Sequence, residues 1–240
     1  MRTINQTLRL ANNQFYPVEK EKTQIFLHHT AGTNAKGAIS WWNQTPDHVG
    51  TAYVIDRDGT IYQAFDDDMW AFHLGITNDD NECEKHSVGI EIVSAGQLYK
   101  VGDKFMFYPI YPSLLAAVEI PKEEVAILEN EWKGYKYYHK YTPEQIDSVI
   151  WLIGELSKKF NIPIEFPLGK FYEFDDSRFK EIMKGRPGVY SHSSVRKDKS
   201  DIYPSVELLK ALESPNDYLN SQDSFKGKED IKKKPKKENI

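Results

Sequence analysis

Two widely separated segments of this sequence could carry metal chemistry. His28 follows the apolar run at residues 25–27, and His192 follows the apolar strand candidate at 188–190, nine residues before Asp201. Imidazole and carboxylate groups are good zinc ligands, and three protein ligands plus one open position make a catalytic zinc site. The compact HExxH signature is absent. Such a site would therefore have to be assembled from distant parts of the chain.

The first segment, "TQIFLHHTAG" at residues 23–32, ends in two adjacent histidines. Successive side chains of a strand point to opposite faces. His28 and His29 are therefore not expected to serve one site together. The pattern alone does not decide which of them, if either, takes part in chemistry, because a histidine is more often structural or solvated.

Glu91 is a second candidate, because it interrupts the apolar strand "VGIEIV". A carboxylate is costly to bury unless it is paired. One interpretation puts Glu91 on the solvent face of a half-exposed strand. The other makes it a partly desolvated carboxylate whose raised pKa suits a general base. The residues leave both interpretations open.

Composition narrows the function classes. The chain has 240 residues with 40% hydrophobic and 28% charged content, typical of a globular protein. Its net charge of −5 argues against nucleic acid as a partner. Cys83 is the single cysteine, which excludes an intrachain disulfide and multi-thiolate zinc sites. We find no signal-peptide pattern and no run long enough to span a membrane, so we expect synthesis in the cytoplasm.

The elements that must position these residues follow from periodicity. Strands are predicted at 23–29, 86–96 and 188–192, and a short helix at 35–42. "YVIDRDGTIYQ" predicts a hairpin that turns at Asp58-Gly59, and "LYKVGDKFMFYP" a second one at Gly102-Asp103. Thr142-Pro143-Glu144-Gln145 is a capping box that opens a long amphipathic helix. A last helix is expected from about 204 to 212.

Strands, hairpins and helices interleave, so we expect a single α/β domain with a mixed central β-sheet flanked by helices. This domain is predicted to span residues 1–213, with an extended hairpin and flap inserted at about 96–141. Residues 214–240 form a lysine-rich tail; its last 20 residues hold seven lysines against four acidic residues. We expect that tail to be disordered.

Five motifs occur here in the order found in one known family. They are "IFLHHTAG", "YVIDRDGTIYQ", "AFHLG", "SVGIEIV" and "GVYSHSSVRKDKSD". On these the chain resembles the type 2 N-acetylmuramoyl-L-alanine amidases, which are related to peptidoglycan-recognition proteins and to phage endolysins. The resemblance covers roughly residues 20–212. It implies the family's fold, with a zinc site in a surface groove.

The resemblance also implies roles for particular residues. The zinc ligands would be His28, His192 and Asp201; the Lys-x-Asp pattern favours Asp201, although Asp198 is an alternative. Glu91 would be the catalytic carboxylate, and Lys199 would assist it. His29 would then keep a structural role.

Substrate contacts are implied for two further residues. His73 in "WAFHLG" would line the groove wall, and Trp70 could stack on sugars. Trp41 and Trp42 could also stack on sugars, but we expect at least two of the three tryptophans to be core residues.

The function implied is zinc-dependent hydrolysis of the amide between the lactyl group of N-acetylmuramic acid and L-alanine in peptidoglycan. Two alternatives stay open: a non-catalytic peptidoglycan-binding protein, and a zinc endopeptidase of the peptidoglycan stem or cross-bridge. We expect a monomer that acts on the bacterial cell wall after phage-type release, with no nucleic-acid partner and no membrane span.

Overall fold

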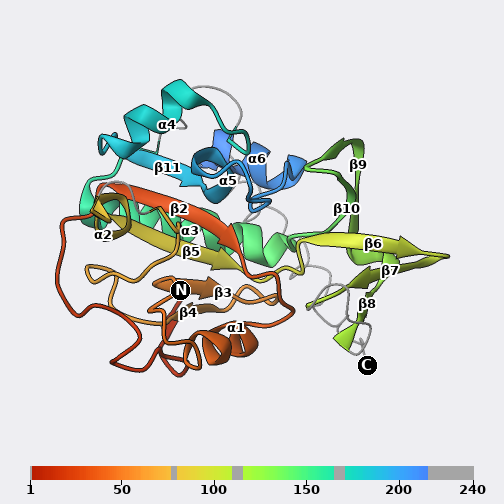
Figure 1. Ribbon diagram of the computed structural model, residues 1–240, viewed down its shortest axis with the longest axis horizontal. Coiled ribbons are helices and arrows are strands. Elements are labelled where there is room, and N and C mark those ends of the chain that lie inside the picture. The colour runs from red at the N-terminus through yellow and green to blue at the C-terminus, as the bar shows by residue number, and fades with distance from the viewer. Residues whose placement is uncertain (1, 77–79, 110–115, 165–170, 216–240) are drawn as a thin grey trace, which may run out of the picture.

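The computed structural model describes residues 2–76, 80–109, 116–164 and 171–215 of the chain (Figure 1). The strands are β1 (Ile4–Asn5), β2 (Gln24–His29), β3 (Tyr53–Ile55), β4 (Ile61–Gln63), β5 (Ser87–Ile92), β6 (Gln97–Val101), β7 (Lys104–Phe107), β8 (Val118–Ile120), β9 (Val125–Trp132), β10 (Tyr135–His139) and β11 (Gly188–Ser191). The helices are α1 (Ala35–Trp42), α2 (Glu82–Lys85), α3 (Pro143–Phe160), α4 (Asp176–Met183), α5 (His192–Val195) and α6 (Val206–Glu213), and a 3-10 turn, η2, covers Lys122–Glu124.

Six strands form the central sheet, in the order β1-β4-β3-β5-β2-β11. The strands β3, β5, β2 and β11 run parallel to one another, whereas β3 and β4 pair antiparallel. Helices lie against this mixed sheet (Figure 1), which confirms the predicted α/β class. Because β5, β2 and β11 are parallel, their carboxyl ends meet at one edge of the sheet. That edge positions the candidate site.

The β3–β4 connection is the hairpin predicted from Asp58-Gly59. Gly59 has φ of 82°, and its N–H donates to the carbonyl of Asp56 at 2.9 Å. A Cβ at this position would lie 2.7 Å from the carbonyl oxygen of Glu144 at the start of α3. Both the left-handed backbone and this close approach require glycine.

Helix α3 begins at the predicted capping box. The Thr142 hydroxyl accepts from the N–H of Gln145, and the Gln145 side chain accepts from the N–H of Thr142, each at 3.0 Å. The helix shares one core with one face of the sheet, including Ile25, Leu27, Val88, Ile90, Ile146, Val149, Ile150 and Ile153. Residues on the other face pack with α4 and α5, including Phe26, Tyr190, Ile182 and Val195. Helices thus cover both faces of β2.

The inserted segment forms a sheet of its own. Its five strands are ordered β8-β7-β6-β10-β9, and β6 and β7 form the hairpin predicted at Gly102-Asp103. Beyond that hairpin, β10 pairs antiparallel with both β6 and β9. The extended flap expected in this segment stays a prediction. A small apolar core accompanies this pairing: Ala95, Leu98, Phe105, Phe107, Ile120 and Val125. Figure 1 shows this second sheet beside the carboxyl ends of the central strands.

The predicted last helix is α6, which ends at Glu213. Most of the predicted lysine-rich tail, residues 216–240, lies outside the described residues. Among the helices that the structure does describe, none has both the length and the apolar content needed to cross a bilayer.

Candidate metal centre

His28 and Glu91 lie at the carboxyl-end edge of the central sheet. They are register partners on the parallel strands β2 and β5. Side chains in register on adjacent strands leave the sheet on the same face. On the other side of β2, Ser191 ends β11 opposite Leu27, so the next residue, His192, follows beside His28. His192 was predicted as the last residue of the strand, but it is the first residue of α5.

His29 points to the opposite face, as strand alternation predicts. It is buried, and its Nδ1 lies 3.0 Å from the hydroxyl of Tyr141. Its ring also fills the space above Gly96, where a Cβ would approach Nε2 to 2.6 Å. His29 is therefore packed between β2 and the start of the second sheet, away from His28.

Three potential ligand atoms converge at the sheet edge. The Nδ1 atoms of His28 and His192 lie 3.0 Å apart, and Asp201 Oδ2 lies 3.1 Å from the first and 2.9 Å from the second. All three side chains are buried. The carbonyl of Asp201 accepts from the N–H of Ser193 at 2.7 Å, which ties the loop that carries Asp201 to α5. The geometry makes these residues a candidate metal site.

Asp198, the alternative third ligand, lies elsewhere. Its carboxylate accepts from the guanidinium of Arg196 at 2.7 and 2.8 Å, and its side chain is 61% exposed. That pairing with Arg196 holds the pKa of Asp198 below its usual range. The structure therefore brings Asp201 to the two histidines and leaves Asp198 at the surface.

The outer nitrogens of both histidines are held by hydrogen bonds that leave Nδ1 free to bind a metal. His192 Nε2 donates to the carbonyl of Leu74 at 3.0 Å, which puts its proton on Nε2. Ser87 Oγ donates to the carbonyl of Cys83 at 2.6 Å, so it accepts from His73 Nε2 at 2.8 Å. His73 Nδ1 is then the acceptor for His28 Nε2 at 3.0 Å.

The protonation states suit a cation. Burial and the neighbouring His192 lower the pKa of His28 to about 4, so its imidazole is neutral near pH 7. Burial alone would raise the pKa of Asp201, but its contacts with His192 and His28 hold that pKa well below its usual range. Two imidazoles and one carboxylate are a donor set typical of zinc. The residues therefore fit this metal.

Glu91 faces the same site. Burial and the negative charge of Asp201 raise its pKa well above the ordinary value, while the positive charge of Lys199 opposes this shift. Its Oε2 atom is buried and has no hydrogen-bond partner among the residues that the structure describes. A buried carboxylate oxygen without a partner is costly and needs an explanation. Of the two interpretations of Glu91, the placement supports the desolvated carboxylate over the solvent-facing one.

The two residues predicted to contact substrate are packed inside the protein. His73 has a side chain only 4% exposed, and both of its ring nitrogens bond to protein groups, which places it beneath His28 and not on an open wall. Trp70 is 8% exposed and stacks on Tyr16 at 4.0 Å. Trp42 is buried too, whereas Trp41 is 60% exposed. Two of the three tryptophans are therefore core residues, as expected.

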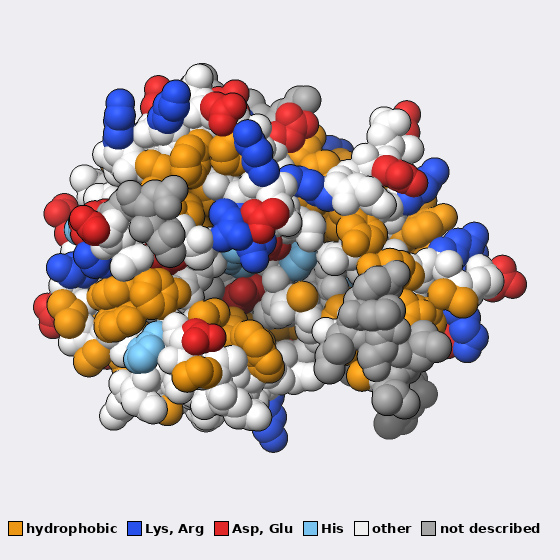
Figure 2. Space-filling view, viewed as in Figure 1, with side chains coloured by type: hydrophobic (Ala, Val, Ile, Leu, Met, Phe, Trp, Pro, Cys, Tyr) orange, Lys and Arg blue, Asp and Glu red, His pale blue; other side chains and the backbone are white. Residues whose placement is uncertain are grey.

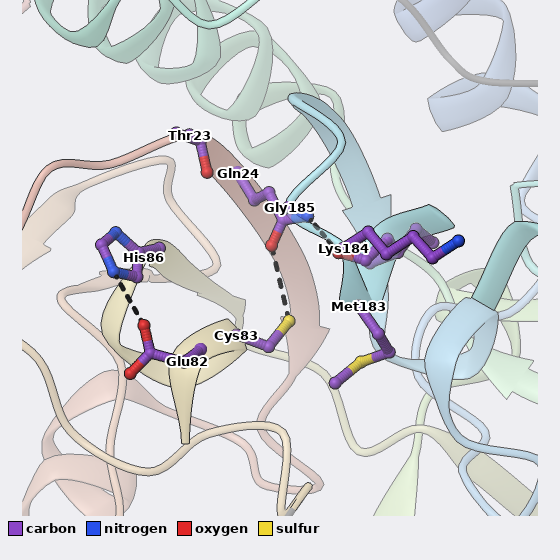
Figure 3. Close-up of a pocket in the computed structure, with 9 residues that line it drawn as sticks. Thr23, Gln24, Glu82, Cys83, His86, Met183, Lys184 and Gly185 are labelled. Carbon is purple, nitrogen blue, oxygen red and sulfur yellow. Dashed lines mark hydrogen bonds and ion pairs between the residues drawn. The ribbon is translucent and has the colours of Figure 1, made fainter. Parts of the chain in front are cut away.

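Figure 2 shows histidine side chains at the bottom of a hollow in this face, with lysine or arginine side chains at its rim. A separate pocket of about 310 Å³ lies at the other end of the parallel strands, between α2 and the end of α4. Figure 3 shows two pairs among the residues that line it: Cys83 Sγ donates to Gln24 Oε1 at 3.4 Å, and His86 Nε2 lies 3.3 Å from Glu82. We assign that pocket no chemistry.

Sequence reasoning missed the groups that hold the histidine rings. The carbonyls of Leu74 and Cys83 belong to the backbone, and a backbone carbonyl has no signature in residue type. Ser87 is an ordinary strand residue by sequence, and only the fold places its hydroxyl 2.8 Å from His73.

Comparison with known proteins gives a family match. The family described as N-acetylmuramoyl-L-alanine amidase matches residues 19–204. No curated protein matches the chain. Similar solved structures include PlyL, at 13% identity and a TM-score of 0.49, covering 90% of this chain and 99% of that one. Another is the amidase LysC from Clostridium intestinale, at 16% identity and a TM-score of 0.41, covering 89% of this chain and 99% of that one. A third is AmiD from E. coli, at 16% identity and a TM-score of 0.48, covering 85% of this chain and 61% of that one.

Proposed function

The chain belongs to the N-acetylmuramoyl-L-alanine amidase family, and from this premise we propose that it is a zinc-dependent peptidoglycan amidase. The bond cut is the amide between the lactyl group of N-acetylmuramic acid and L-alanine. The place of action is the bacterial cell wall, reached in phage-type lysis.

The observation that carries this proposal is the convergence of His28 Nδ1, His192 Nδ1 and Asp201 Oδ2 within hydrogen-bonding distance of one another. We assign these atoms as the zinc ligands. When bound, zinc supplies Lewis acidity that lowers the pKa of water to about 7 and polarises a carbonyl. The hydrogen bonds on Nε2 of both imidazoles favour the tautomer in which Nδ1 is available to the metal.

Glu91 is the proposed general base and acid. Its side chain lies on the same face of the sheet as that of His28. Its carboxylate is desolvated and has a raised pKa, which makes it a stronger base toward the attacking water. It accepts a proton from the attacking water and returns it to the leaving amine of L-alanine. Its Oε2, which has no hydrogen-bond partner in the described part of the chain, is available for that proton.

Lys199 is proposed to stabilise the negative charge that develops on the oxygen of the scissile carbonyl. It lies close enough to Glu91 to lower that residue's pKa, and it precedes Asp201 by two residues. A fixed donor or cation aimed at a tetrahedral oxygen is typically worth roughly 3 kcal/mol of transition-state stabilisation. We expect Lys199 to provide this stabilisation from the loop that carries Asp201.

The two alternatives make different demands on these residues. A non-catalytic binding protein needs neither a complete ligand set nor a desolvated Glu91, and this chain has both. An endopeptidase of the stem or cross-bridge would use the same metal centre on another amide. Substrate contacts of His73 and Trp70 are not part of the proposal, because both side chains are buried.

Metal content tests the proposal. Purified protein should hold about one zinc per chain, lose hydrolysis of peptidoglycan on chelation, and recover it when zinc is added back. Full hydrolysis by protein shown to be metal-free would overturn it.

A further inference from the structure

The outer nitrogens of both candidate zinc histidines bond to consecutive residues of one loop. His28 Nε2 lies 3.0 Å from His73 Nδ1, and His192 Nε2 donates to the carbonyl of Leu74 at 3.0 Å. The two histidines come from strand β2 and helix α5, 164 residues apart. The loop at residues 73–75 therefore fixes the orientation of both imidazole rings.

That loop is held in turn by Glu84, on the short helix α2. The side chain of Glu84 is fully buried. Its Oε2 accepts from the N–H of His73 at 2.8 Å, its Oε1 accepts from the N–H of Gly75 at 2.8 Å, and the N–H of Leu74 lies 3.0 Å from both oxygens. The backbone N–H groups of His73, Leu74 and Gly75 thus converge on one carboxylate, an arrangement that stabilises a buried anion.

Arg196 holds the same loop from the α5 side. Its Nη1 donates to the carbonyls of Leu74 at 3.1 Å and Gly75 at 2.8 Å. Gly75 has φ of 64°, and a Cβ there would meet the guanidinium at 2.7 Å. The loop's N–H groups thus face Glu84, while its carbonyls face His192 and Arg196.

We propose that Glu84 is a positioning residue for the metal centre. Its carboxylate fixes the loop at residues 73–75, and through that loop it sets the ring orientation and the tautomer of His28 and His192. This inference rests on the proposed role of the two histidines as zinc ligands. Groups that hold metal-binding imidazoles by their outer nitrogen typically change metal affinity by 10–100-fold when they are removed.

The first test replaces Glu84 by its neutral isostere. Glu84→Gln keeps the size of the side chain but sets an amide N–H₂ against the backbone donors of the loop. The matched control is Asp67→Asn, another carboxylate-to-amide change at a buried residue, whose partners are Tyr53 and Lys159. Both variants lose buried charge-assisted hydrogen bonds, so both should have a lower thermal midpoint. Zinc affinity is measured for each by competition with a chromophoric chelator, at a temperature where the metal-free protein is folded.

We expect Glu84→Gln to bind zinc about 10–100-fold more weakly than wild type, and Asp67→Asn to bind it with unchanged affinity. Equal zinc affinity in Glu84→Gln and wild type would overturn the inference, and so would equal losses in the two variants. If the wild-type protein itself binds no zinc, the proposed function fails together with the inference.

A second pair of variants keeps the inference testable if Glu84→Gln does not fold. In His73→Asn the amide oxygen takes the place of Nδ1 and can still accept from His28 Nε2, whereas His73→Leu has no acceptor. We expect His73→Asn to bind zinc with nearly wild-type affinity and His73→Leu to bind it at least tenfold more weakly. That result would show that the loop holds the His28 ring in place. Equal affinities in the two variants would refute it.

Discussion

His28 and Glu91 stand opposite each other on the parallel strands β2 and β5, so the candidate ligand and the candidate base leave the sheet on one face. Glu91→Gln keeps the shape of the side chain and removes only its ability to exchange a proton. We expect zinc binding to be retained and turnover on peptidoglycan to fall by about a hundredfold or more. Steady-state assays at matched zinc content measure this; turnover near the wild-type level would return Glu91 to a structural role.

The stability of the metal-free protein should also depend on Glu91. Burial raises its folded-state pKa well above the ordinary 4.5, so the folded protein holds this proton to higher pH than the unfolded chain does. Stability from Glu91 is then fully present below pH 4.5 and is lost as the pH rises through the folded-state pKa. Glu91→Gln should therefore be more stable than wild type near neutral pH, and the difference should shrink as the pH falls. Thermal midpoints measured across pH test this, and a variant less stable than wild type at neutral pH would contradict it.

Substitution of the two adjacent histidines, His28 and His29, should have very different effects on zinc binding. His28→Ala removes a converging Nδ1 and should abolish zinc binding. His29→Ala leaves the hydroxyl of Tyr141 without its bond to the ring, at a cost of about 1–3 kcal/mol of stability, and should keep zinc binding. Calorimetric zinc titration of both variants checks this, and the reverse pattern would mean that the faces of β2 are wrongly assigned.

Asp201 and Asp198, on the loop that follows α5, form a matched pair for mutation. Asp201→Asn removes the only charge in the proposed ligand set, so zinc affinity should fall by more than the roughly 10–100-fold that supporting groups contribute. Asp198→Asn breaks an exposed ion pair with Arg196, worth about 0.2–1 kcal/mol, and should leave zinc affinity nearly unchanged. A larger loss in Asp198→Asn would make Asp198 the ligand.

Much of the fold follows from local sequence patterns. The capping box at Thr142 and the turn at Gly59 involve residues that are neighbours along the chain, so composition and spacing reveal them. The second sheet was missed in part because the pairing of β10 with β6 joins segments that are far apart along the chain. Strand β9 has eight residues but buries only Val125, so it lacks the apolar alternation that marks a strand.

The site was predictable only in part. Strand alternation separates His28 from His29, but the resemblance, not the spacing, predicts that His192 and Asp201 join His28. Glu84 was missed because its partners are backbone N–H groups of another loop, which no residue type announces. His73 was expected on a groove wall, and its burial beneath His28 follows from tertiary packing alone.

Product analysis on purified peptidoglycan tests the central claim most directly. The proposed amidase should release peptides with a free amino group on L-alanine and leave the glycan strands uncut, with no new reducing ends. A glycosidase would generate reducing ends, and it would use a pair of carboxylates in place of a metal centre. Mass spectra in which the lactyl–alanine amide stays intact, while amines of other stem or cross-bridge residues appear, would contradict the proposed function.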